Sequence, residues 1–231
     1  MQYHTLDTLW VMLTVAVLNQ KGGVGKSTLS TNLAAAAHLG GQRTMILDLD
    51  RQGSAFDWYA ARKEGSRLDG LTVARADKAL SLPKFRELTQ GYEVVLCDGP
   101  PRLSDISRAA AVAADVVVVP LRAGGFDWWA ASETLDLLDS ADSVRVELGR
   151  KKVRRVFVLN GAVANANLTA TAVSAIGEIG ELASVVIHNR VAYSEAATLG
   201  ESVLTSHEGS PAADEIQALF RALMKEKTDH G

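Results

Sequence analysis

The sequence predicts an α/β fold, with one doubly wound, mostly parallel β-sheet and helices on both of its faces. Apolar runs of strand length alternate with helical patterns along the chain. Several of these runs, such as the four valines at 116–119, are unbroken β-branched stretches without in/out alternation. Runs of this kind are typical of strands covered on both faces, as in parallel sheets.

Each element is expected from its own pattern, and right-handed crossovers should join the strands. Strands are expected at 13–19, 44–49, 71–74, 93–97, 115–121, 153–159 and 182–187. Helices are expected near 26–39, 54–64, 82–90, 104–113, 126–142, 168–179 and 191–199. A last helix follows Ser210, which can cap it, and Pro211, which suits its first turn. The apolar residues of that helix, at 216, 219, 220 and 223, form one face.

Composition excludes several classes of protein. The chain has 231 residues, a net charge of −3 and one cysteine, so we expect no overall basic field, disulfide framework or cysteine-based metal site. No apolar run is long enough to suggest a membrane span, and residues 1–11 lack the basic start of a signal peptide. We therefore expect a cytoplasmic protein with a single domain at 12–231 after a short extension at 1–11.

The segment KGGVGKST at 21–28 lies between the first predicted strand and an amphipathic helix. The usual phosphate-loop pattern, G-x-x-x-x-G-K-[ST], would place a glycine at position 20, but this chain has Gln20 and opens the loop with Lys21. Small residues let backbone N–H groups point into one concavity, and the helix N-terminus adds partial positive charge. The loop residues expected to cradle phosphates are Gly22, Gly23, Val24 and Gly25.

The start of the following helix supplies the side chains of this site. Lys26 is expected to reach the β- and γ-phosphates, Ser27 to ligate Mg²⁺, and Thr28 to donate to the α-phosphate. The alternative interpretation is a glycine-rich turn without a ligand, which the Lys-Ser-Thr sequence in a strand–loop–helix context disfavours.

Acidic residues end two of the predicted strands. Asp48 and Asp50 lie in the segment DLDRQ at 48–52, and Asp98 opens the segment DGPP at 98–101. An apolar strand that ends in aspartate is the Walker-B arrangement, in which the carboxylate holds Mg²⁺ through water at the carboxyl edge of the sheet. The alternative is that these aspartates only begin turns, which the nearby phosphate loop makes less attractive.

Lys21 and these motifs make the chain resemble the ParA/MinD family of deviant Walker-A ATPases, from about residue 13 to about residue 225. The resemblance implies a P-loop NTPase fold that binds ATP and Mg²⁺. It also implies that Lys21 crosses to the nucleotide bound by the other subunit of an ATP-dependent homodimer. A lysine from each side would offset the repulsion between the two facing sets of phosphates.

The same resemblance assigns further roles to individual residues. Asp50 is the residue that positions or activates the attacking water, and Asp48 supports the Mg²⁺ shell. Arg51 stands where the family usually has proline. Asn160, at the end of the sixth predicted strand, is the residue that contacts adenine, although an asparagine that only turns the chain is an equally good interpretation.

The phosphate loop begins within about the first twenty residues of a short chain. In this respect the chain is similar to the ParF-like partition ATPases. This similarity implies slow ATP hydrolysis, assembly into dimers or higher forms, non-specific binding to nucleoid DNA, and release when a ParB-like or other small partner stimulates hydrolysis. The basic run at 150–155 is either a DNA-contacting patch, which Arg190, Arg221, Lys225 and Lys227 would extend, or a solvated loop.

Two alternatives share the phosphate loop. One is a related ATPase that positions a protein cargo, such as a chemotaxis array or a carboxysome. The other is a MinD-like membrane-cycling ATPase, which needs a basic amphipathic helix at its C-terminus, whereas the last predicted helix starts with acidic residues and leads into a polar tail. We therefore expect no stable membrane association.

Overall fold

A computed structural model describes residues 12–102, 104–122, 127–162, 174 and 181–224. The expected extension at 1–11 and nearly all of the helix expected at 168–179 lie outside these ranges. Within the described ranges, no helix is long and apolar enough to cross a membrane.

The described strands form one sheet in the order β3-β2-β4-β1-β5-β6-β7, and β8 pairs with β6 as well. Every described pairing is parallel, as the β-branched runs predict. The strands are β1 (Leu13–Val17), β2 (Thr44–Asp48), β3 (Thr72–Arg75), β4 (Val94–Asp98), β5 (Val116–Leu121), β6 (Arg154–Ala162), β7 (Glu181–Leu182) and β8 (Ile187–His188).

The prediction of one strand at 182–187 is wrong. The chain forms two short strands there, and both pair with β6. β6 pairs with β7 at Val156 and Phe157 and with β8 at Asn160 and Ala162, so its neighbour changes between Phe157 and Asn160. Within the pairing with β8, the register shifts between Asn160 and Ala162.

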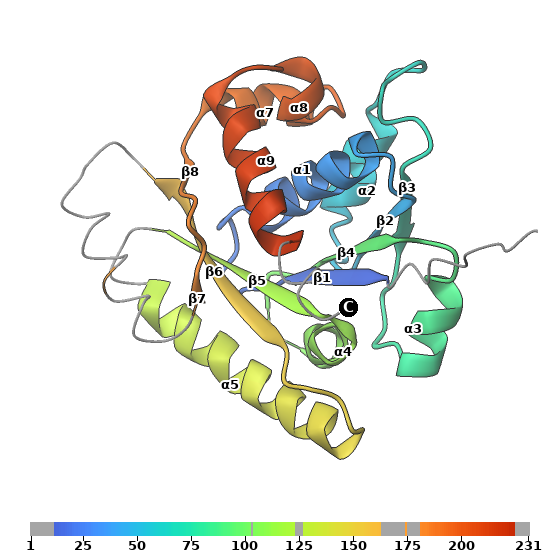
Figure 1. Cartoon of the computed structure of the whole chain (residues 1–231), viewed down its shortest axis with the longest axis vertical. Coiled ribbons are helices and arrows are strands. Elements are labelled where there is room, and N and C mark those ends of the chain that lie inside the picture. The colour runs from blue at the N-terminus through green and yellow to red at the C-terminus, as the bar shows by residue number, and fades with distance from the viewer. Residues whose placement is uncertain (1–11, 103, 123–126, 163–173, 175–180, 225–231) are drawn as a thin grey trace, which may run out of the picture.

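Helices cover both faces of the sheet (Figure 1). One face carries α1 (Lys26–Leu39), α2 (Ser54–Ala60), α7 (Val191–Thr198), α8 (Val203–Ser206) and α9 (Pro211–Met224). The opposite face carries α3 (Leu82–Leu88), α4 (Asp105–Ala113) and α5 (Asp127–Glu147). The fold is thus the predicted doubly wound α/β domain.

The two layers have separate hydrophobic cores, and alternate residues of β1 serve each of them. Leu13, Val15 and Val17 pack into the core beneath α1 and α9, whereas Ala16 packs into the core beneath α4 and α5. Because both faces of the strand are buried, its sequence is apolar except for the buried Thr14.

Local capping explains two helix boundaries. Ser210 Oγ accepts a hydrogen bond from Ala213 N at 3.3 Å, so the predicted cap of α9 is confirmed. The short helix α8 was not predicted. It starts at a capping box in which Ser202 Oγ accepts from Leu204 N, and Thr205 Oγ1 accepts from Ser202 N.

The strand order has a topological switch point beside β1. The chain winds toward β2 and β3 on one side of this strand and toward β5 and β6 on the other. Open α/β sheets bind ligands outside the carboxyl ends of the strands at such a switch point. The phosphate loop follows β1 and therefore lies at this edge of the sheet.

Candidate functional site

The phosphate loop depends on two glycines with left-handed backbone conformations. The φ angles of Gly23 and Gly25 are 71° and 93°, a region that L side chains rarely adopt. A Cβ atom on Gly25 would also approach the amide nitrogen of Asn160 to 2.1 Å. The loop can therefore lie close to the end of β6 only with glycine at this position.

Lys26 is buried within the loop, with 7% of its surface exposed. Its Nζ donates a hydrogen bond to the carbonyl of Lys21 at 2.9 Å. Burial lowers the pKa of Lys26, while the carboxylates of Asp98 and Asp50 oppose that shift. The structure thus brings the predicted phosphate-binding lysine and two of the predicted acidic residues into one electrostatic cluster.

Asp98 lies at the end of β4 and is fully buried. Ser30 Oγ donates to its Oδ1 at 2.9 Å, whereas its Oδ2 is buried and has no hydrogen-bond partner among the described residues. Burial raises the pKa of Asp98 to about 7, and the nearby hydroxyl group of Ser27 opposes the shift. An unsatisfied buried carboxylate oxygen costs free energy unless a cation or donor completes its coordination.

The surroundings of this oxygen fit Mg²⁺. The cation would be held by Ser27 and, through water, by Asp98, the roles that the sequence predicts for these two residues. Mg²⁺ is commonly bound by one or two carboxylates together with substrate phosphates. Among the described residues, no group of three or more His, Cys, Asp or Glu side chains is arranged to hold a metal ion.

Asp48 stands beside Asp98 in the register of β2 and β4. Its Oδ1 accepts from Asp50 N, and its Oδ2 accepts from Ala55 N and Phe56 N, each at 3.0 Å. Both oxygens therefore cap the first turn of α2 and the turn before it.

These contacts give Asp48 a structural role beside the one that the resemblance implies. Its carboxylate holds the backbone of the first turn of α2 and of the turn before it through three N–H groups, and its support of the Mg²⁺ shell remains a prediction. Burial raises the pKa of Asp48, and the three backbone bonds oppose that shift.

Asp50 begins a tight turn between β2 and α2. Gly53 N donates to Asp50 O, and Gln52 N donates to Asp50 Oδ1, both at 3.0 Å. The carboxylate is half-buried and is one of the two that act electrostatically on Lys26. Its predicted place beside the phosphate loop is thus consistent with this structure.

Lys21 lies at the start of the loop, where its N–H donates to Asn19 Oδ1 at 2.8 Å. Its side chain is exposed. Exposure fits a side chain that would act on a second subunit, and this role remains a prediction.

Asn160 lies at the end of β6, on the other side of the loop. Its Nδ2 donates to the carbonyl of Val24 at 2.6 Å, so the side chain connects β6 to the loop backbone. The sequence did not predict this connection. Asn160 also lines a cavity of about 570 Å³ that is shared by the loop, Arg122 and the segment from β8 to α7. The adenine contact therefore remains a prediction with a suitable cavity beside it.

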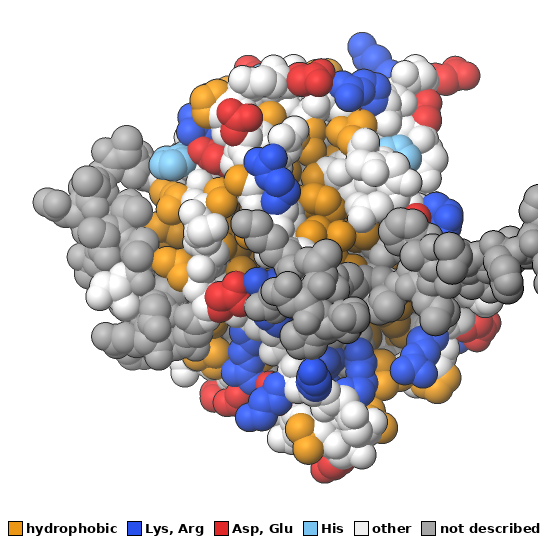
Figure 2. All heavy atoms as spheres, in the orientation of Figure 1, with side chains coloured by type: hydrophobic (Ala, Val, Ile, Leu, Met, Phe, Trp, Pro, Cys, Tyr) orange, Lys and Arg blue, Asp and Glu red, His pale blue; other side chains and the backbone are white. Residues whose placement is uncertain are grey.

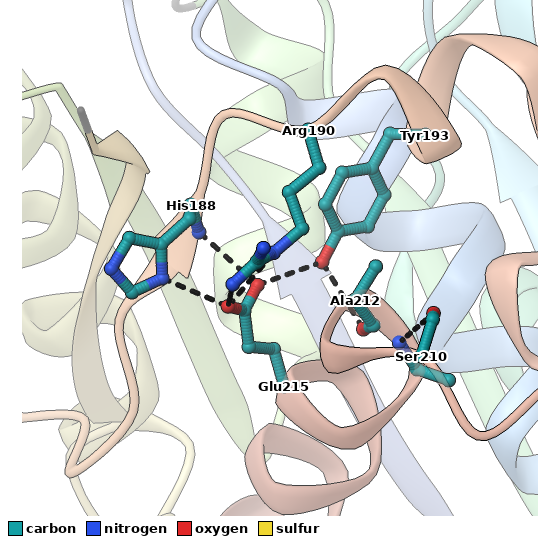
Figure 3. Close-up of polar contacts among 7 residues, drawn as sticks. His188, Arg190, Tyr193, Ser210, Ala212 and Glu215 are labelled. Carbon is teal, nitrogen blue, oxygen red and sulfur yellow. Dashed lines mark hydrogen bonds and ion pairs between the residues drawn. The ribbon is translucent and has the colours of Figure 1, made fainter. Parts of the chain in front are cut away.

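The segment from β8 to α7, which lines this cavity, is held to α9 by Glu215 (Figure 3). Glu215, on α9, accepts from Arg190 Nη2 at 2.6 Å and from the backbone N–H of His188 at 3.2 Å. It also bonds His188 Nδ1 at 2.8 Å and Tyr193 Oη at 3.3 Å. Burial raises the pKa of Glu215, but the bonds from Arg190 and His188 outweigh it and leave the pKa below its ordinary value.

Arginines of the basic run at 150–155 bond to internal partners. The run leads into β6 and so lies at the amino edge of the sheet, opposite the phosphate loop. Figure 2 shows basic side chains gathered over α4 and the C-terminal half of α5, with acidic side chains among them. Lys151 and Lys152 are exposed. The pairs are Arg150 with the carbonyl of Val112, Arg154 with Glu181, and Arg155 with Asp139 and Asp142.

Known proteins resemble the chain in sequence and in fold. A family model described as the CobQ/CobB/MinD/ParA nucleotide binding domain matches residues 15–216. The chromosome-partitioning ATPase Soj of Thermus thermophilus is 31% identical over 242 residues, covering 91% of this chain and 94% of that protein.

The name of a second relative describes a different role. The maintenance of carboxysome distribution protein A of Halothiobacillus neapolitanus is 27% identical over 217 residues, covering 91% of this chain and 96% of that protein. Among solved structures, an ATP complex of Cyanothece McdA matches with a TM-score of 0.73 at 17% identity, covering 93% of this chain and 96% of that one. At this identity the structural likeness shows the fold alone.

Proposed function

Because the chain belongs to the CobQ/CobB/MinD/ParA family of nucleotide-binding domains, we propose that it is a ParA-type positioning ATPase that binds ATP with Mg²⁺ at the carboxyl edge of its sheet. ATP hydrolysis is the activity of this family's ParA and MinD members. The observation that carries the proposal is that buried Lys26 interacts electrostatically with buried Asp98. The Oδ2 atom of Asp98 has no hydrogen-bond partner among the described residues.

Each loop residue has a distinct task in this proposal. The N–H groups of residues 22–25 and the ammonium of Lys26 bind the phosphates, and Thr28 donates to the α-phosphate. Mg²⁺ held by Ser27 and Asp98 would neutralise charge on the β- and γ-phosphates during transfer.

The hydrolytic step is assigned to Asp50. Its half-buried carboxylate, near Lys26, accepts the hydrogen bond of an attacking water and aligns it with the γ-phosphate. Little covalent chemistry is required of the protein, because phosphoryl transfer depends mainly on positioning and charge stabilisation. The rate is slow until a partner stimulates it.

Assembly follows ATP binding. Two chains pair through their ATP sites, with Lys21 of each chain acting on the partner's phosphates, and higher assemblies can grow from the dimer. The dimer binds DNA without sequence preference and is therefore nucleoid-associated in the cytoplasm. A ParB-like or other small partner stimulates hydrolysis and releases it, so that a plasmid or chromosome is segregated. The similarity to Soj supports this cycle.

A second candidate is a positioning ATPase with a protein cargo. It is favoured by the similarity to a carboxysome-distribution protein, which extends over 91% of this chain. The two candidates share the ATP cycle and differ in what the stimulating partner carries.

The metal-dependent ATP site can be tested with purified parent and Asp98→Asn. ATP affinity and phosphate release are measured over an Mg²⁺ series, and Asp105→Asn, which removes an exposed carboxylate of α4, is the matched control. The parent and the control should bind ATP more tightly with Mg²⁺ and release phosphate. Asp98→Asn should lose the Mg²⁺ dependence. An Asp98→Asn variant with the parent's Mg²⁺ dependence, or a parent that does not release phosphate, would contradict the proposal.

A further inference from the structure

We propose that Arg75 is a positioning residue for the turn at 50–53, called the switch turn here, and that it fixes the backbone from which Asp50 acts. The inference rests on the proposed ATPase function. It comes from contacts between the end of β3 and the switch turn, two segments that are separate in the sequence.

The switch turn has few bonds of its own. Gly53 N donates to Asp50 O at 3.0 Å, which closes a four-residue β-turn with Arg51 in its second position. Gln52 N donates to Asp50 Oδ1 at 3.0 Å. The carboxylate of Asp50 is therefore bonded to the same turn that carries it, so its placement depends on how well the turn is held.

Arg75 supplies a bond to the turn from outside it. It is the last residue of β3, and its register partner on β2 is Asp48, two residues before Asp50. Its Nη2 donates to the carbonyl of Arg51 at 2.8 Å. The donor is charged, so this bond is of the stronger kind, although the site is exposed.

Two further distances show that the guanidinium lies close to the turn and to α2. Its central carbon lies 5.8 Å from the centroid of the Phe56 ring on α2. A Cβ atom on Gly53, whose φ is 71°, would lie 3.1 Å from the same carbon. Gly53 thus leaves room for the guanidinium, and Arg75 joins the carbonyl of Arg51 to the first turn of α2.

This geometry separates the effect of Arg75 from phosphate binding. Lys26, Ser27 and Asp98 belong to α1 and β4, and the described contacts of Arg75 go to the switch turn and Phe56. Loss of the guanidinium should therefore loosen the switch turn and lower kcat, while ATP affinity stays close to that of the parent.

A second substitution makes the test specific. Proline is favoured at the second position of such a β-turn because its φ is already fixed near the required value. The hydrogen bonds described for the turn use the N–H groups of Gln52 and Gly53 and not that of Arg51. Arg51→Pro should therefore stiffen the turn without the guanidinium, and it should rescue Arg75→Ala.

The experiment compares the parent, Arg75→Ala, Arg51→Pro and the double variant. The control is Arg67→Ala, which removes another exposed arginine whose ion pair, with Glu208, is on the surface. Two quantities are measured for each protein: amide hydrogen exchange across 50–53, and kcat with the dissociation constant for ATP.

Arg75→Ala should speed exchange of the Gln52 and Gly53 amides and lower kcat by about 3- to 10-fold, the loss expected for one hydrogen bond. The double variant should recover both values, and Arg67→Ala should match the parent. Unchanged exchange in Arg75→Ala, an equal loss of ATP affinity and kcat, or no recovery with Arg51→Pro would overturn the inference. A parent without phosphate release would overturn the proposed function instead, while the exchange data would still show whether Arg75 holds the turn.

Discussion

The ammonium of Lys26 donates a hydrogen bond to the backbone carbonyl of Lys21, at 2.9 Å. This hydrogen bond joins the two lysines of the phosphate loop, but their side chains lie in different surroundings. Lys26 is buried inside the loop, whereas the side chain of Lys21 is exposed. This difference predicts separate effects when each lysine is replaced.

Lys26→Ala should abolish ATP binding. Its ammonium is the buried cation of the loop, close to Asp98 and Asp50, and its loss would leave these carboxylates to repel the phosphates. Equilibrium binding of a fluorescent ATP analogue measures the effect, with Lys84→Ala, an exposed lysine of α3, as the control. A Lys26→Ala variant that binds the analogue as tightly as the parent would contradict the phosphate-loop assignment.

Lys21→Ala should keep much of the parent's ATP affinity, because Lys26 and the backbone N–H groups of the loop remain. It should fail to dimerise, since the two sets of facing phosphates would lose a lysine from each subunit. Sedimentation with ATP and Mg²⁺ reports the dimer, and the parent with ADP serves as the monomer reference. ATP-dependent dimers of Lys21→Ala at the parent's concentrations would remove the proposed role of Lys21 in the partner's site.

Asp50→Ala should bind ATP and dimerise but hydrolyse ATP slowly. The substitution leaves Lys26 and Asp98 in place and removes the carboxylate proposed to align the water. Loss of such a group commonly lowers the rate by about 10²-fold or more. Single-turnover phosphate release measures the step directly, and turnover equal to that of the parent would assign the water to another residue.

DNA binding provides a test of the exposed lysines of the basic run. Arg150, Arg154 and Arg155 have internal partners, so their replacement would disturb the fold as well as the surface. Lys151→Ala/Lys152→Ala avoids this problem.

If these two lysines meet phosphates in each subunit, the ATP dimer neutralises about four DNA phosphates through them. The slope of log K against log salt should then become less steep by about 0.9 for each phosphate that the variant leaves without a lysine. Binding to random duplex DNA is measured over a salt series with ATP and with ADP. An unchanged affinity and slope in the variant would place the DNA-binding surface elsewhere on the molecule.

Glu215 should make stability depend on pH. Its bonds to Arg190 and His188 hold its pKa below the ordinary value of 4.5 in the folded chain. A lowered pKa means that the folded state favours the charged carboxylate, so the stabilisation is fully present above the ordinary value and is lost as the pH falls through the folded value.

Glu215→Gln should therefore unfold more easily near neutral pH and show a shallower loss of stability in acid. Denaturant midpoints from pH 7 downward measure this, with Glu195→Gln, an exposed acid paired with His207, as the control. Equal pH dependence in Glu215→Gln and the parent would contradict the assignment. His188, Arg190 and Tyr193, which Glu215 contacts, line the cavity beside Asn160. Glu215→Gln should therefore also weaken ATP binding.

Much of the fold follows from local sequence. The unbroken valines of β5 and the apolar run of β1 predict buried parallel strands, because each residue of such a strand meets a core on one face or the other. The cap at Ser210 and the phosphate loop are also local signals, since their partners lie within a few residues along the chain.

Interactions between distant segments were not predictable in the same way. Asp48 accepts the N–H groups of Ala55 and Phe56 on α2, and Glu215 on α9 accepts from Arg190 and from the backbone of His188. The arginines of the basic run could equally have faced solvent. In each case the partner depends on which elements the sheet brings together.

The sequence by itself determined the alternation of strands and helices, the phosphate loop and the acidic strand ends, because these depend on periodicity and on neighbours along the chain. Only the tertiary structure decided that Arg75 bonds the carbonyl of Arg51, and that Asn160 connects β6 to the loop at Val24. Both pairs depend on the strand order, in which β3 flanks β2 and β6 lies beyond β5. That order is set by how the whole chain buries its apolar faces, so no single segment of the sequence specifies it.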